Sequence, residues 1–60
     1  MKAPILNAET KNQAVKLLEE LGSVEFEYRN EIGKSGQDIL KIVGMDSDFE
    51  ILAYTIIDLN

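Results

Sequence analysis

The stretch Asp38-Ile-Leu-Lys-Ile-Val-Gly-Met45 carries long aliphatic and β-branched side chains at both odd and even positions. Side chains of these types favour a strand. Because successive side chains of a strand point to opposite faces, this strand is apolar on both faces and needs cover on each. The sequence therefore predicts a central strand over residues 38–45.

The segment before it predicts a second strand over residues 23–30. Val24, Phe26 and Tyr28 alternate there with charged residues, which is the period-two pattern of a half-buried strand. The intervening residues 31–37 contain two glycines and a serine and predict a turn. The two strands are therefore expected to pair as an antiparallel hairpin.

The pairing of this hairpin can be predicted from side-chain chemistry. Setting Phe26 opposite Leu40 or Ile42 gathers the apolar residues on one face, whereas a one-residue slip would set Phe26 opposite Lys41. The same register places Lys41 across from an acid, Glu25 or Glu27, a pairing worth roughly a few tenths of a kcal/mol. The face then left over mixes apolar and charged side chains, and either the C-terminal segment or a second chain could cover it. Its members are Glu25, Glu27, Arg29, Ile39, Lys41, Val43 and Met45.

An N-terminal helix of about 11 to 14 residues is predicted between a capping box and a glycine stop. Thr10 and Gln13 match the capping box, although Asn7 is an alternative N-cap. Gly22 supplies the residue that can turn left-handed after the last helical turn. Between them, an apolar stripe recurs at helical spacing: Ala14, Val15, Leu17, Leu18 and Leu21.

Residues 47–59 fit two interpretations. Phe49, Leu52, Ile56 and their apolar neighbours follow the helical period, and residues 47–50 match a second capping box. The β-branched run at residues 55–57 instead favours a strand. We expect a helix here, so the predicted fold class is α+β: an N-terminal helix packed on an antiparallel β-hairpin, with a C-terminal helix. The alternative is a third antiparallel strand, which gives the order αβββ.

Sixty residues predict one small domain spanning 1–60, with a thin hydrophobic core, because a chain of this size removes only about 60% of its unfolded surface from water. Cysteine and histidine are absent, which excludes disulfides and the usual zinc sites. Self-association is the remaining way to supplement the core. We therefore expect a homodimer, with Ile39, Val43 and Met45 as the oligomer face.

The chain offers little for catalysis. Without histidine or cysteine, acid–base chemistry would fall to carboxylates, lysine or tyrosine, and no serine–histidine–aspartate arrangement can form. The acids of residues 46–50 resemble the start of a calcium loop, but that loop requires glycine and glutamate where Ile51 and Ile57 stand. We expect no enzyme activity, no cofactor and no metal.

The net charge of −5 arises entirely after Gly22, and no basic residue follows Lys41. Such a surface repels nucleic acid, so no direct nucleic-acid binding is expected. Two acids at the end of the predicted helix oppose the helix dipole, which suggests that they are kept for a basic partner; the alternative is that they only aid solubility. The predicted partner-binding acids are Glu19, Glu20, Glu25 and Glu27.

No apolar run approaches the roughly 20 residues of a membrane span, and no signal peptide is apparent after Met1. The composition is compatible with the cytoplasm, and the initial methionine suggests a complete small open reading frame. We expect a small acidic regulator or inhibitor that binds a basic nucleic-acid-binding enzyme, by analogy with the inhibitors that phages and mobile elements encode. The alternative is a structural or assembly subunit of a larger complex. A nucleic-acid-binding module would require Arg29, Lys34 and Lys41 to converge at the hairpin tip.

Overall fold

The computed structural model describes residues 3–59, so Met1 lies outside the described residues. The elements follow the order β1 (Ile5–Asn7), α1 (Lys11–Glu20), β2 (Glu25–Ile32), β3 (Asp38–Met45) and β4 (Ile51–Asp58). The strands form one mixed sheet in the order β1-β4-β3-β2. β2, β3 and β4 are antiparallel neighbours, and the short β1 pairs with β4 in parallel. The α+β class is confirmed.

The helix has the predicted capping residues at both ends, although its 10 residues are fewer than the 11 to 14 expected. The Thr10 hydroxyl accepts a hydrogen bond from the Gln13 N–H at 3.1 Å, and the Gln13 side chain accepts one from the Glu9 N–H. At the other end Gly22 has a φ of +99°, and the N–H of Ser23 donates to the Leu18 carbonyl. This bond pattern is a Schellman motif, which satisfies the last carbonyls of the helix.

The expected C-terminal helix is wrong, and the alternative third antiparallel strand is correct. Residues 47–50 form a hairpin turn in which the Asp46 carboxylate accepts hydrogen bonds from the N–H groups of Asp48 and Glu50. β4 then pairs along the free edge of β3. The pairing satisfies backbone groups of the central strand that a helix would leave without partners. β1 was not predicted from the sequence; it pairs with β4, and Ile5 lies opposite Tyr54.

The central position of β3 is confirmed, with its predicted boundaries, whereas β2 lies two residues later than expected. As expected, even-numbered residues of β2 lie opposite even-numbered residues of β3, but the predicted pairs themselves are wrong. Phe26 lies opposite Gly44, and Lys41 lies opposite Arg29 rather than an acid. The turn fixes this register: the Gly33 N–H donates to the Gln37 carbonyl at 2.7 Å, which closes the hairpin on a five-residue connection.

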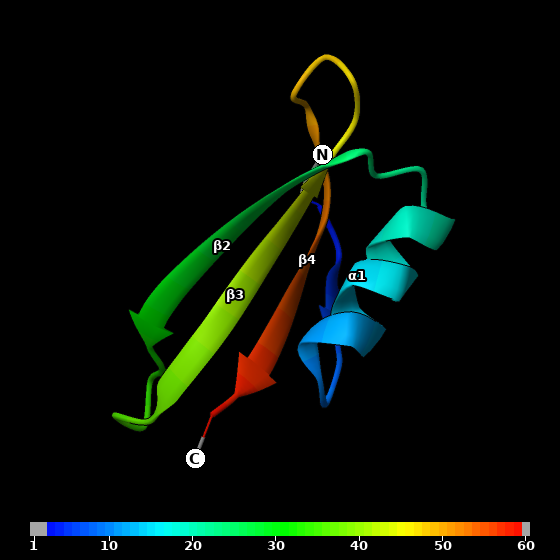
Figure 1. Ribbon diagram of the computed structural model, residues 1–60. Helices are drawn as coiled ribbons and strands as arrows, with labels where there is room; N and C mark the ends of the chain where they lie inside the picture. The colour runs from blue at the N-terminus through cyan, green and yellow to red at the C-terminus, as the bar shows by residue number, and fades with distance from the viewer. Residues whose placement is uncertain (1–2, 60) are drawn as a thin grey trace.

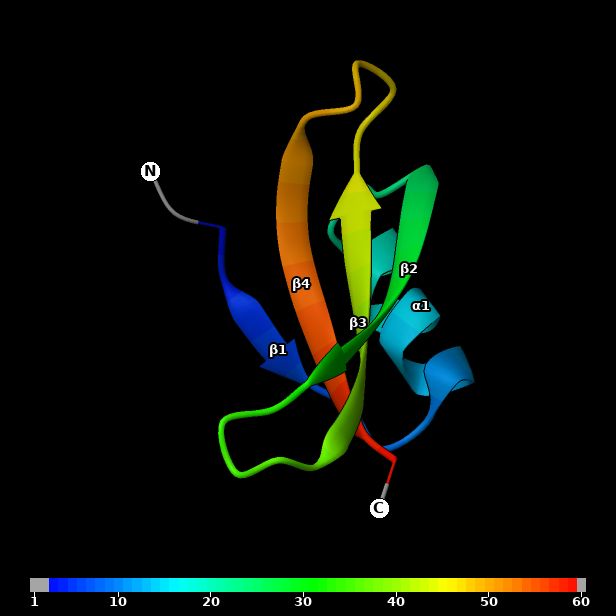
Figure 2. The ribbon, with the colours of Figure 1, turned by 90° about the vertical axis from the view of Figure 1, so that its left-hand side faces the viewer.

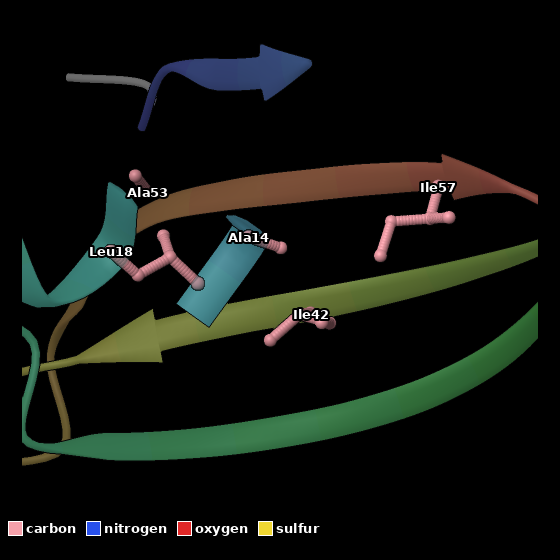
Figure 3. Packing of buried hydrophobic residues seen from close by; sticks show 5 residues of the cluster. All are labelled: Ala14, Leu18, Ile42, Ala53 and Ile57. Carbon is pink, nitrogen blue, oxygen red and sulfur yellow. The ribbon is translucent and has the colours of Figure 1, made fainter. Parts of the chain in front are cut away.

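The core lies between α1 and one face of the sheet (Figure 1). α1 packs over β3 and β4 and leaves most of β2 uncovered. Leu18 is fully buried, which stabilises the fold by about 1.5–3 kcal/mol. Figure 3 shows the buried cluster of Ala14, Leu18, Ile42, Ala53 and Ile57.

The opposite face of the sheet carries no helix or strand among residues 3–59 (Figure 2). The C-terminal segment lies beside β3 as β4 and so does not cover this face. We call it the open face. Because side chains alternate between the two faces of a strand, the odd-numbered residues of β2 and β3 lie on the open face, where they pair with one another. Its members on these strands are Glu25, Glu27, Arg29, Glu31, Ile39, Lys41, Val43 and Met45.

Candidate functional site

The predicted oligomer face and half of the predicted acidic surface meet on the open face. Glu25 lies opposite Met45, and Glu27 lies opposite Val43. Val43 is only 2% exposed and Ile39 is also buried. Met45 is half-buried. The homodimer through these three residues stays a prediction.

Long side chains cover the middle of the open face. The Lys41 ammonium lies 4.6 Å from the centre of the Tyr54 ring, a cation–π distance. Arg29 donates a hydrogen bond to the Glu27 carboxylate, and this interaction raises the pKa of Arg29 above its ordinary value. Arg29 and Lys41 lie opposite each other, whereas Lys34 belongs to the β2–β3 turn. Both paired cations are thus engaged within the chain.

A second group of acids gathers at one end of the molecule. The last turn of α1, the start of β2 and the β3–β4 turn all lie toward that end, and the β3–β4 turn projects beyond the other two (Figure 1). The chain just after α1 lies near the start of β4, since a Cβ atom on Gly22 would stand 3.9 Å from the Leu52 side chain. We call these three segments the acidic end. Its carboxylates are Glu19, Glu20, Glu25, Asp46, Asp48 and Glu50, and the segments contain no lysine or arginine.

Three of the four predicted partner-binding acids therefore belong to the acidic end. Glu19 and Glu20 come from the helix and Glu25 from the adjoining strand, and all three are exposed. Glu27 lies farther along β2 and is engaged with Arg29. The sequence pattern did not reveal that the acids of the β3–β4 turn join this group, because a helix was expected there.

The acidic end also presents apolar side chains to solvent. Phe49 is 67% exposed, and its φ of +63° lies in the left-handed region that favours glycine. Its neighbour Ile51 is also exposed and lies opposite Met45 on the open face. Leu21 at the end of α1 adds a third exposed apolar side chain. Sequence reasoning missed Phe49, because only the turn conformation reveals its exposure and strain.

A separate hollow of about 320 Å³ lies where the β2–β3 hairpin meets the end of β4. Ile39 and Leu59 supply apolar lining, while Glu31 and Asp38 supply carboxylates. The remaining lining comes from Asn30 and Ile32. This hollow lies at the opposite end of β3 from the acidic end, since it contains the first residue of that strand.

The part of the chain that the structure describes contains no cluster of three or more metal-ligating side chains. It also contains no helix long and apolar enough to cross a membrane. Comparison with protein-family models, with curated proteins and with solved structures yields no match for this chain.

Proposed function

We propose that this protein is a small regulator or inhibitor that binds the basic surface of another protein through the acidic end. The single observation that carries the proposal is that Phe49 exposes its aromatic side chain from a left-handed backbone conformation. Strained backbone and exposed apolar surface both oppose stability, and strained residues gather at functional sites. Aromatic side chains are also the residues that most often anchor protein interfaces.

The charges around Phe49 define the partner. Asp46, Asp48 and Glu50 lie within three residues of it along the chain, and Glu19, Glu20 and Glu25 belong to the other two segments of the acidic end. A rim of one sign attracts an oppositely charged surface and speeds association. An apolar anchor within an acidic rim fits a partner that presents an apolar pocket among lysines and arginines.

A nucleic-acid-binding enzyme is a suitable target type, because its basic groove offers such a surface. The regulator would then occupy part of that groove and exclude nucleic acid, as small phage-encoded inhibitors do by analogy. The protein itself would perform no chemistry and act in the cytoplasm. The role of an assembly subunit is the competing proposal, and it is favoured by the free backbone edge of β2.

Affinity capture from candidate host lysates at low and moderate salt tests the proposal. The bait is the wild-type chain, compared with a variant in which Glu19, Glu20 and Glu25 are replaced by glutamine. A matched control replaces Glu9, Glu31 and Asp58, which lie outside the acidic end, with the corresponding amides. We expect a basic protein that the control retains and the first variant loses. Equal capture by both variants, or capture insensitive to salt, would overturn the proposal.

A further inference from the structure

We propose that β2 is a self-pairing edge: two copies of the chain join their β2 strands antiparallel about a twofold axis at Tyr28. The result would be one continuous eight-stranded sheet. This inference is independent of the partner proposed above. It also differs from the oligomer face of Ile39, Val43 and Met45, because it uses the strand edge.

The backbone of β2 is available for such pairing. The Gly33–Gln37 bond shows that odd residues of β2 direct their N–H and carbonyl groups to β3. The hydrogen bond from the Leu59 N–H to the Asp38 carbonyl agrees with this, because it shows that even residues of β3 direct their backbone groups to β4 and odd residues direct theirs to β2. Phe26, Tyr28 and Asn30 consequently direct both backbone groups away from the sheet, where no strand lies among residues 3–59.

The exposed apolar side chains of β2 and of the residue just before it are symmetric about Tyr28. Val24 is 59% exposed, Tyr28 47% and Ile32 68%, and they follow one another at intervals of four residues. Tyr28 and Ile32 belong to the helix-side face by alternation, but α1 packs over β3 and β4 instead. Val24 precedes the strand, and its N–H donates to the Met45 carbonyl at 2.9 Å. From α1, the Lys11 ammonium lies 4.7 Å from the centre of the Tyr28 ring and leaves the ring half-exposed.

Pairing about Tyr28 covers this apolar strip. An antiparallel arrangement centred there sets Val24 opposite Ile32 of the second copy and the two tyrosines opposite each other. Cross-strand contacts between apolar and aromatic side chains of this kind stabilise a sheet. The two copies therefore bury the side chains that α1 leaves uncovered.

Charge is compatible with the same register. Centring on Tyr28 sets Glu27 opposite Arg29 of the second copy, twice by symmetry, and opposite charges across a strand pair stabilise it. Centring on residue 27 or 29 would set like charges face to face. Centring on Asn30 also pairs opposite charges, Arg29 with Glu31, but it shortens the overlap and leaves Val24 unpaired. The Tyr28 register also sets Glu25 opposite Glu31, a repulsion that the Asn30 register lacks, so the longer overlap of β2 and the cover of Val24, rather than charge, favour Tyr28.

The apolar contact at each end of the paired strands adjoins an existing hollow. Ile32 lines the hollow of about 320 Å³, together with Ile39 and Leu59. Val24 of the second copy would arrive beside Ile32, at the margin of this apolar lining. The open face stays exposed in the dimer, and the two acidic ends lie at opposite ends of the joined sheet, so each could bind a partner.

Sedimentation over a range of concentrations, with charge-swapped variants, tests both the edge and the register. We expect the wild type to form a closed dimer. Arg29→Glu should raise its dissociation constant at least about tenfold, because two carboxylates then face each other across the strand pair. Combining it with Glu27→Arg restores opposite charges only in the Tyr28 register and should restore the dimer. Ile32→Lys should weaken the dimer, whereas Ile5→Lys, a similarly exposed site on β1, should not.

All of these side chains are at the surface, so each variant should keep the fold, and circular dichroism checks that it does. A wild type that stays monomeric, or a dimer insensitive to Ile32→Lys, would overturn the proposal. Failure of the double charge swap to restore a dimer lost in Arg29→Glu would overturn the Tyr28 register. Growth into indefinite assemblies would overturn the closed dimer and favour an assembly subunit.

Discussion

Gly44 lies directly against Leu18: a Cβ atom on Gly44 would stand 2.9 Å from the Leu18 Cδ2 atom and would also collide with the Ser23 hydroxyl. The absence of a side chain at the end of β3 thus lets the last turn of α1 approach the sheet. This contact sets how closely the last turn of α1, which carries Glu19 and Glu20, lies against the sheet.

Gly44→Ala should therefore destabilise the fold by about 1–3 kcal/mol, because the added methyl group has no space among buried atoms. Chemical denaturation measures the change. Gly33→Ala is the matched control, since the atoms nearest its Cβ belong to the end of the Gln37 side chain, which can move at the cost of one exposed hydrogen bond from the Ser35 N–H. Equal losses for the two variants would show that Gly44 does not control the helix–sheet approach.

Phe49→Gly should raise the free energy of unfolding by about 0.5–1 kcal/mol. Glycine adopts the left-handed conformation without the strain of about 1–2 kcal/mol that a Cβ incurs, although its own flexibility offsets part of the gain. Thermal unfolding would register this as a higher Tm. Phe26→Gly is the contrasting variant, because Phe26 packs against the core and its loss should destabilise. A lower Tm for Phe49→Gly would mean that the phenyl ring stabilises the turn.

Thr55 offers a test of buried polarity. It is fully buried on the helix side of β4, and its hydroxyl has no hydrogen-bond partner within residues 3–59. Thr55→Val keeps the shape and removes the unsatisfied group, so it should stabilise the fold by about 1 kcal/mol. The same substitution at Thr10 should destabilise by about 1 kcal/mol, because it removes the N-cap bond to Gln13. Urea denaturation of both variants should give opposite signs, and a shared sign would refute this assignment.

Local sequence pattern was enough to predict α1. Capping residues and periodicity defined α1, because Thr10, Gln13 and Gly22 act on their immediate neighbours. Residues 47–59 could not be assigned in this way, since their apolar residues suit both periods. The choice between helix and strand depended on a residue range distant in sequence, because the backbone groups on the second edge of β3 required a neighbouring strand. β1 was missed because three residues are too few for a pattern.

The candidate site was predictable to a similar extent. The sequence identified Glu19, Glu20, Glu25 and Glu27 as acids that a basic partner could bind, but it could not group them in space. The structure separates Glu27, which is engaged with Arg29. Phe49 became a candidate only through its φ and its exposure, and both depend on the turn that the helical interpretation excluded.

The central proposal is that the acidic end binds a basic protein through Phe49. Its most direct test is the affinity of a captured partner for Phe49→Asn, measured by titration calorimetry against wild type. Asparagine tolerates the left-handed conformation, so the turn and its acids are preserved while the aromatic anchor is lost. We expect the dissociation constant to rise at least about tenfold, as for an interface hot spot. Unchanged affinity in a folded Phe49→Asn variant would contradict the proposal.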